Sequence, residues 1–255
     1  MGTVSKALGL LDFLKDPSAR LGLTEIARLA DFDKATTRRL LLELMANGFV
    51  EQDHSGKHYV LGPSLQLLGK AREERFPLFK TVLPIVRTLA ETTGETVHAA
   101  EYVAGSLMSV CIQESDKANR VSLSPGMKLP LHATASGLAY LATATPAFVE
   151  QFLRKPRSTY TSHTMVDAAQ IQKLIKQTRA SGYSISNQAL EDGIHSVAAA
   201  FVDTKGKPVG TIAVAMPSIR ATAAKIAACG DAVKAAVVET SMRLYGQSFH
   251  LHKAS

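Results

Sequence analysis

The sequence has few cysteines and no motif that would bind a metal ion or form a redox pair. Cys111 and Cys229 are its two cysteines, and each stands among apolar or small residues. Neither Cys-x-x-Cys nor His-Glu-x-x-His occurs, which excludes the common zinc sites and dithiol redox centres. Isolated cysteines in such surroundings are most often buried free thiols, so we expect no metal ion and no other cofactor.

A long apolar run is also lacking. A helix that crosses a bilayer needs about 20 predominantly apolar residues, and no stretch of the 255 residues approaches that length. The chain begins MGTVSKALGLLDFLKD, with acidic Asp12 where a signal peptide would continue apolar towards a cleavage site. We therefore expect a cytoplasmic protein with no membrane partner.

The net charge does not locate a nucleic-acid site. A formal charge of +7 suggests such a partner at first sight. Residues 1–75, however, hold eleven Lys and Arg against ten Asp and Glu, so most of the excess lies further along the chain. Only the local arrangement of basic residues can therefore indicate a DNA site.

Helical patterns and a hairpin pattern fill the first 62 residues. After an amphipathic first helix, LTEIARLA indicates a short second helix with Thr24 as its N-cap. Asp33 can cap a third helix, KATTRRLLLELMANG, which Asn47-Gly48 ends. The β-prone pairs FVEQ and HYVL then flank a glycine-bearing tip. This order predicts a winged helix-turn-helix domain over residues 1–62.

The start of the third helix is the predicted DNA reader. It is basic and hydroxyl-bearing, has no acidic residue, and precedes the leucines of the same helix. Arginine reads guanine edges in the major groove, and threonine reaches bases or phosphates. Taken alone, KATTRR could equally be a solvated basic helix end. The residues predicted to contact DNA are Thr24, Lys34, Thr36, Thr37, Arg38, Arg39, Lys57 and His58.

The nearly even charge of this domain bears on oligomerisation. Few phosphate contacts per subunit would give a single copy little affinity for DNA. We therefore expect a dimer or a larger oligomer.

Beyond residue 62 the pattern changes twice. A charged amphipathic stretch opened by Pro63 predicts a linker helix over 63–76. Residues 77–247 predict a mixed α/β domain, which makes the chain α+β overall, and a short tail follows over 248–255. Helices are expected at 78–93, 135–144, 146–154, 167–181 and 220–245, and strands at 96–104, 106–114, 119–123, 196–203 and 208–216.

The segment PLHATASG (130–137) admits two interpretations. His132 could activate the hydroxyl of Thr134 or Ser136, but the chain has no Gly-x-Ser-x-Gly elbow and the segment has no carboxylate. Alternatively, Thr134 is an N-cap, and the amides of Ala135 and Ser136 at the helix start bind an anion. We favour the second interpretation, with His132 bonded to a backbone carbonyl; a hydrolase or transferase is the alternative.

From Val4 to about Gly246 the chain resembles the IclR family of bacterial transcriptional regulators. The first half carries VSKALGLLDFL, LTEIARLADFDKATTRRLL, GFVEQ and YVLGPSLQLLG; the second carries TTGETVHAA, LPLHATASGLAYLA, SGYSISNQALEDGIHSVAAAFVD and GKPVGTIAV. The resemblance implies a non-enzymatic regulator, a repressor in our interpretation, acting as a homodimer or homotetramer. It also implies two partners, double-stranded operator DNA and a small carboxylate effector bound by the second domain.

The same resemblance implies which residues hold the effector. The family's small keto-acid sensors carry an acid at the place of Ser186, a cysteine at Ser196, and serines at Ala213 and Ala215. The less polar residues here favour an effector with an aromatic or alkyl body and one carboxylate. The predicted ligand-binding residues are Val121, Leu129, Ala135, Ser136, Ser186, Ile194, Ser196, Ala213 and Ala215.

Overall fold

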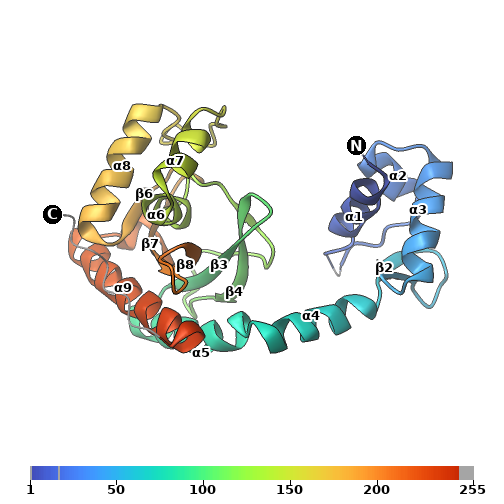
Figure 1. Cartoon of the computed structure of the whole chain (residues 1–255), viewed down its shortest axis with the longest axis horizontal. Coiled ribbons are helices and arrows are strands. Elements are labelled where there is room, and N and C mark those ends of the chain that lie inside the picture. The colour runs from blue at the N-terminus through green and yellow to red at the C-terminus, as the bar shows by residue number, and fades with distance from the viewer. Residues whose placement is uncertain (1, 17, 247–255) are drawn as a thin grey trace. The chain divides into compact units, whose positions relative to one another are not determined.

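The computed structural model describes residues 2–16 and 18–246. The chain divides into two compact units, Met1–Phe76 and Pro77–Ser255 (Figure 1). The tail expected at 248–255 lies outside the described residues. Among the described helices, none combines the length and the apolar character that a bilayer span requires.

The first unit has the predicted order of three helices, a hairpin and a further helix, which confirms the winged helix-turn-helix. The helix faces meet around the fully buried Leu10, Ile26 and Leu41. The elements are α1 (Thr3–Phe13), α2 (Leu23–Ala30), α3 (Lys34–Ala46), the antiparallel strands β1 (Val50–Gln52) and β2 (Tyr59–Leu61), and α4 (Ser64–Arg75).

Helix caps in this unit follow the prediction at α3 but not at α2. Asp33 Oδ1 accepts a hydrogen bond from Thr36 N at 2.7 Å and begins α3 as expected. At α2 the N-cap is Gly22 in an extended conformation. The predicted cap at Thr24 is therefore wrong, because Thr24 already lies inside the helix.

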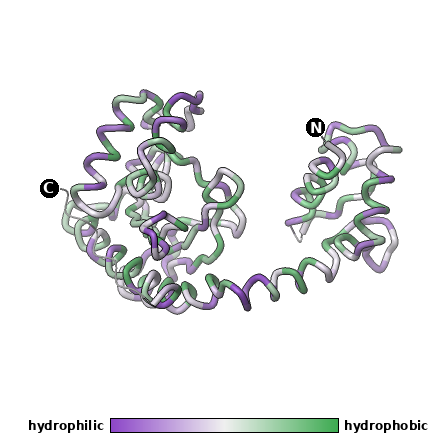
Figure 2. Tube along the Cα trace, in the orientation of Figure 1, coloured by the Kyte–Doolittle hydropathy of each residue, from purple (hydrophilic) through white to green (hydrophobic). Residues whose placement is uncertain are grey.

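No residue of α4 is buried. Figure 2 shows the helix changing along its length from an apolar first half to a hydrophilic second half. The apolar half includes Leu67 and Leu68, each more than half exposed. In an isolated chain this surface is therefore left in contact with solvent.

The second unit is built on one antiparallel sheet of six strands in the order β5-β4-β3-β8-β7-β6. Helices α5 (Leu78–Thr93) and α9 (Ala223–Tyr245) pack on one face, and α6 (Ala135–Thr143) and α8 (Ala168–Ser181) lie on the other (Figure 1). The remaining elements are β3 (Thr96–Val103), β4 (Ser106–Gln113), β5 (Lys128–Leu129), α7 (Pro146–Leu153), β6 (Ser184–Asn187), β7 (Ile194–Val202), β8 (Pro208–Pro217) and the 3-10 turn η1 (Ser218–Arg220).

Small residues let α6 pack close to its neighbours. Its Ala135 and Ala139 form a buried cluster with Ala198 and Ala213 of the sheet. A side chain at Gly137 would place its Cβ 2.3 Å from the Cα of Leu131, a separation that atoms cannot adopt. These close contacts hold the first turn of α6 in place.

The strand expected at 119–123 is wrong, since these residues have no strand structure. The carbonyl of Val121 instead accepts a hydrogen bond of 2.6 Å from the side chain of Thr96. A side-chain bond of this kind satisfies the backbone of a loop without a neighbouring strand. The short strands β5 and β6 were not expected.

Candidate functional site

The amino-terminal end of α3 is an exposed basic surface. Lys34, Arg38 and Arg39 are exposed, and within the described part of the chain their side chains make no hydrogen bond or ion pair. The opposite side of the same helix is buried through Leu40, Leu41 and Leu44. The helix is thus anchored on one side and presents free cations on the other, as a recognition helix requires.

Thr37 does not belong to this surface, and its prediction as a DNA contact is wrong. It is fully buried, and its Oγ1 donates a hydrogen bond of 2.9 Å to the carbonyl of Asp33. The reason is helical spacing, because Thr37 lies three, four and seven residues before Leu40, Leu41 and Leu44 and therefore shares their face. Thr36 is half-buried beside it.

At the hairpin tip, an aspartate organises the turn. Asp53 Oδ1 accepts from Ser55 Oγ at 2.6 Å, and Asp53 Oδ2 lies 2.9 Å from His58 Nδ1. The hydrogen bonds from Ser55 and then His58 hold the pKa of Asp53 well below its usual range. His58 is half-buried by this contact, whereas Lys57 is exposed, as is Thr24 on α2. Of the two residues at the hairpin tip that were predicted to contact DNA, Lys57 is therefore the more accessible.

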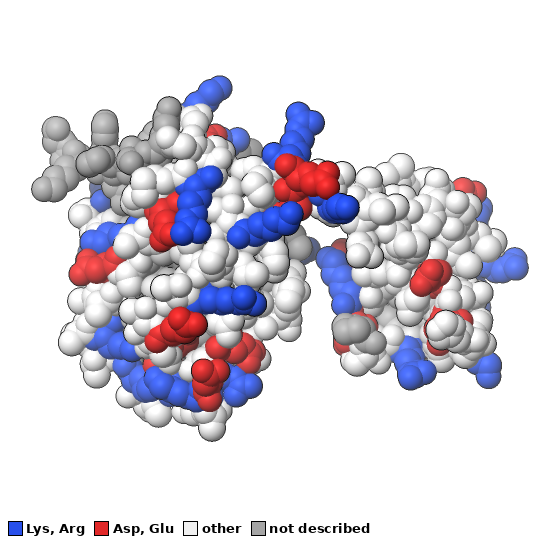
Figure 3. Space-filling view, turned by 90° about the horizontal axis from the view of Figure 1, so that it is seen from below, with Lys and Arg blue, Asp and Glu red and all other residues white. Residues whose placement is uncertain are grey.

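No continuous basic surface covers the face drawn in Figure 3. Basic and acidic side chains lie interspersed on each unit in that view. On this face the exposed cations are therefore scattered among acidic side chains rather than gathered into one basic patch.

A partly open cavity of about 70 Å³ lies in the second unit beside the start of α6. We call it the effector cavity. It brings together seven of the nine predicted ligand-binding residues, from the 121–129 segment, α6, β6, β7 and β8. These seven are Val121, Leu129, Ser136, Ser186, Ile194, Ser196 and Ala215.

Ala135 and Ala213 do not line the effector cavity. Their methyl groups are fully buried in the alanine cluster between α6 and the sheet. The prediction that Ala213 lines the cavity is therefore wrong, because its side chain serves helix packing. Ala135 was predicted for its backbone amide, so the position of its methyl group does not bear on that prediction. Ala215, two residues beyond Ala213 on the same face of β8, does reach the cavity.

The start of α6 leaves backbone donors free. Thr134 is the N-cap, as expected, and its Oγ1 accepts from Gly137 N at 2.9 Å. The first amides of a helix have no intrahelical carbonyl partner, which leaves those of Ala135 and Ser136. Such donors, at the positive end of the helix dipole, favour a bound anion.

His98, on β3, lines the effector cavity and was not predicted. Its Nε2 lies 3.2 Å from Ser136 Oγ, and its Nδ1 has no partner among the described residues. Burial lowers the pKa of His98 to about 4, so the imidazole is neutral at pH 7. The sequence did contain a signal for His98, because it is a polar residue within the otherwise apolar run of the strand TVHAA. Its unpaired nitrogen is a polar atom that a ligand could satisfy.

His132 has a structural contact, as expected. Its Nε2 lies 2.8 Å from the carbonyl oxygen of Ser158. Burial lowers the pKa of His132 despite that bond, so the ring is neutral at pH 7. Among the described residues, no group of His, Cys, Asp and Glu could hold a metal ion.

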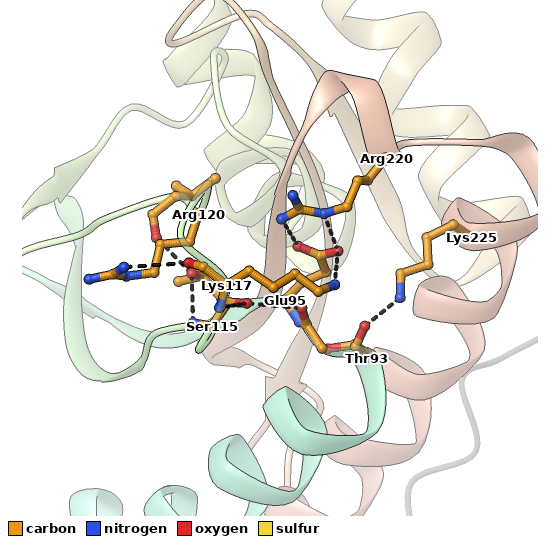
Figure 4. Close-up of polar contacts among 10 residues, drawn as sticks. Thr93, Glu95, Ser115, Lys117, Arg120, Arg220 and Lys225 are labelled. Carbon is orange, nitrogen blue, oxygen red and sulfur yellow. Dashed lines mark hydrogen bonds and ion pairs between the residues drawn. The ribbon is translucent and has the colours of Figure 1, made fainter.

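A buried carboxylate of the second unit was also missed. Glu95 is almost fully buried, and Figure 4 shows it between Arg220 and Lys117. Arg220 donates through Nε to Glu95 Oε1 at 2.8 Å and through Nη2 to Oε2 at 2.6 Å, while Lys117 Nζ lies 3.2 Å from Oε1. Burial alone raises the pKa of Glu95, but the hydrogen bonds and charges of its partners outweigh it and lower the pKa.

The ion pairs of Glu95 are continuous with hydrogen bonds that hold one wall of the effector cavity. Thr96 Oγ1 donates to the carbonyl of Val121 and accepts from Ser115 N at 3.2 Å. Further along the loop, Ser122 Oγ donates to Glu114 Oε1 at 2.5 Å. Val121 and Ser122 line the cavity. The network therefore determines where this wall stands.

Replacing Arg220 by alanine is expected to destabilise the second unit by about 2 kcal/mol. Without Arg220, the buried carboxylate of Glu95 keeps Lys117 as its remaining cation. The desolvation penalty of that carboxylate is then only partly offset. Urea unfolding measures the change. The matched control is Arg243→Ala, which breaks the exposed pair with Glu239 and should cost under about 0.5 kcal/mol. Equal costs for the two variants would contradict the role of Glu95.

The same pair predicts a pH dependence. The pKa of Glu95 is lowered by folding, so its contribution is complete above the unfolded value of about 4.3 and is lost as the pH falls through the folded value. The stability difference between wild type and Arg220→Ala should therefore shrink below about pH 4.

Comparison with known proteins covers nearly the whole chain. A family model for the IclR helix-turn-helix domain matches residues 3–54, and one described as bacterial transcriptional regulator IclR C-terminal matches residues 72–242. The HTH-type transcriptional regulator BhcR of Paracoccus denitrificans is 32% identical, over 93% of this chain and 85% of that protein. The transcriptional repressor IclR of Escherichia coli is 30% identical, over 96% and 90%.

Solved structures agree with these matches. A protein from Silicibacter sp. TM1040 superposes with a TM-score of 0.86 at 34% identity, covering 99% of this chain and all of its own. An IclR homolog from Microbacterium hydrocarbonoxydans, solved in complex with 4-hydroxybenzoate, superposes with a TM-score of 0.82 at 20% identity, over 96% and 100%. The second of these shows likeness of fold alone.

Proposed function

The chain belongs to the IclR family of bacterial transcriptional regulators, and on that premise we propose that it is a repressor released or tightened by a small monocarboxylate. The observation that carries the proposal is the effector cavity at the start of α6, where two amides without helical partners lie beside buried polar side chains. Repression itself is supported by the relatives, among which the E. coli protein is a repressor.

The lining of the cavity favours a single negative charge. It includes no lysine or arginine, and Glu191 is one of its residues. A second carboxylate on the ligand would meet that like charge without a cation to offset it. Apolar side chains such as Leu123 and Leu190 complete the lining and suit a hydrocarbon body.

The free space favours a short body. A free volume of about 70 Å³ is small beside the roughly 300–1,000 Å³ of sites for drug-sized ligands, and suits a ligand of few non-hydrogen atoms. A three- or four-carbon alkyl carboxylate has that size. A ring such as the 4-hydroxybenzoate bound by the Microbacterium homolog would require the wall of the cavity to move.

We propose operator recognition through the basic end of α3, with Arg38 and Arg39 at base edges and Lys57 at the backbone. We further propose a homodimer or homotetramer. Val4 and Leu8 on α1, together with Leu67 and Leu68 on α4, are each more than half exposed. Apolar side chains exposed on two helices of one unit are typical of a surface that another subunit covers.

An enzyme with an accessory DNA-binding domain is the second candidate function, favoured only by the hydroxyl and histidine of PLHATASG. The His132 ring is bonded to the Ser158 carbonyl, and Ser136 is paired with His98, a neutral imidazole that no third group among the described residues orients. A nucleophile needs such an oriented base. We therefore place this candidate second.

Propionate and butyrate are expected to raise the melting temperature of the protein. At about 100 times its dissociation constant a ligand stabilises the folded state by roughly 2.7 kcal/mol. The matched control is butyramide, which has the shape of butyrate without the charge and should give no shift, and succinate should act more weakly than butyrate. A shift with butyramide equal to that with butyrate would exclude an anion site. Recovery of the acids chemically changed would favour the enzyme.

A further inference from the structure

A second hollow in the second unit is larger than the effector cavity. Its volume is about 420 Å³. We call it the outer pocket: it is lined by the turn after β3, residues 128–132, α7 and residues 155–160. Leu129 lines both the outer pocket and the effector cavity, so a single segment forms part of each wall.

The outer pocket is strongly positive. Lys128, Lys155 and Arg157 line it, and none of its lining residues is acidic. The ammonium groups of Lys128 and Lys155 are exposed and make no ion pair or hydrogen bond within the part of the chain that is described. Three like charges around one hollow that no acidic side chain lines attract an anion.

One of the three cations is held rigidly. Arg157 donates through Nε to the carbonyl of Val166 at 2.7 Å and through Nη1 to the carbonyls of Leu153 and Lys155, each at 2.8 Å. Its Nη2 makes no hydrogen bond among the described residues and remains available. A cation fixed before binding loses little side-chain entropy when an anion arrives.

Aromatic side chains form another part of the wall. The His132 ring lies 5.9 Å from that of Tyr160 and 6.4 Å from that of Phe152. Tyr102 is stacked on Tyr140, with ring centroids 4.4 Å apart. The His132 ring is tilted by about 35° to each of its two neighbours, so the rings form an uneven aromatic wall against which the ring of a ligand can pack edge-on or offset.

We propose that the outer pocket is a second ligand site, for an aromatic monocarboxylate. The ring of the ligand packs against Phe152 and Tyr160, and its carboxylate is held by Arg157 and the two lysines. The site is independent of whether the effector cavity binds an alkyl acid.

Equilibrium dialysis of the full chain against radiolabelled benzoate tests the proposal. We expect saturable binding with a Kd below about 1 mM. The Lys128→Glu/Lys155→Glu double variant should weaken it at least tenfold, since both side chains are exposed and their replacement leaves the core untouched. The matched control is Lys173→Glu/Lys205→Glu, which makes the same charge change at exposed positions outside the outer pocket and should bind as wild type does.

A Ser136→Asp variant separates the two sites. It places a charge in the effector cavity and should leave benzoate binding unchanged. Benzoate binding lost in Ser136→Asp but kept in Lys128→Glu/Lys155→Glu would overturn the outer site and assign benzoate to the effector cavity. Absence of saturable binding up to 10 mM, or equal weakening in the control pair, would also overturn it. None of these results would bear on the prediction that butyrate raises the melting temperature of the protein.

Discussion

The Arg38→Ala variant is expected to lose operator binding while its fold and its response to carboxylates stay intact. Arg38 is exposed at the basic end of α3 and has no partner among the described residues, so its removal leaves no protein group unsatisfied. A bidentate arginine contact with guanine contributes about 1–3 kcal/mol. In a dimer the loss occurs twice, and affinity should fall by roughly 30-fold to 20,000-fold.

The measurement uses genomic fragments that the wild-type protein retains, titrated at fixed salt concentration. The matched control is Arg154→Ala, which removes an exposed arginine of the second unit and should leave affinity within twofold. Lys57→Ala should weaken binding to all fragments alike and reduce the salt slope by about 1, as a phosphate contact does. If Arg38→Ala also lost its thermal response to butyrate, the DNA-reading surface would be misplaced.

Thr37→Val tests the reassigned residue on the same helix. Valine has the shape of threonine and loses only the hydrogen bond to the Asp33 carbonyl. The variant should lose about 1 kcal/mol of stability and keep its preference among operator fragments. A change in that preference would restore Thr37 as a DNA contact.

Ser136→Asp is expected to weaken binding of butyrate at least 100-fold. The side chain of Ser136 is buried in the effector cavity beside the free amides of α6. A fixed carboxylate there occupies the anion position and repels the ligand. The fold should persist, because a negative charge at a helix start is favourable.

Calorimetric titration with butyrate measures this effect. The matched control is Ser136→Asn, which has nearly the size of aspartate without its charge and should weaken binding less. Wild-type affinity in Ser136→Asp would contradict an anion site at the start of α6. Its DNA binding should no longer respond to butyrate, while Arg38→Ala should show the converse pattern.

Prediction from the sequence was most complete where structure is local. The expected helix at 78–93 is α5 with the same bounds. Asp33 and Thr134 are N-caps as predicted, because a cap depends on residues only a few positions away. Segments expected to meet through the family resemblance do meet in one cavity, where Ser136, Ser186 and Ser196 come from distant parts of the chain.

The wrong predictions share one physical cause. Which side of a helix or strand is buried depends on the elements that pack against it, and these are distant in the sequence. Thr37 belongs to a basic, polar stretch of the sequence, but its position on α3 places its side chain in the core. Ala213 has the pattern of a cavity residue, yet α6 packs over it. The apolar pattern at 119–123 suggested a strand, but a side chain of β3 bonds its backbone and keeps it a loop.

The sequence by itself determined the order of the elements in the first unit, the N-caps Asp33 and Thr134, and the basic end of α3. These follow from periodicity and from contacts within a few residues. Tertiary structure alone decided that Glu95 pairs with Arg220, 125 positions away, that His98 faces Ser136, and that the effector cavity is small and the outer pocket cationic. Burial and cavity volume depend on which distant surfaces pack together, and no local pattern encodes that.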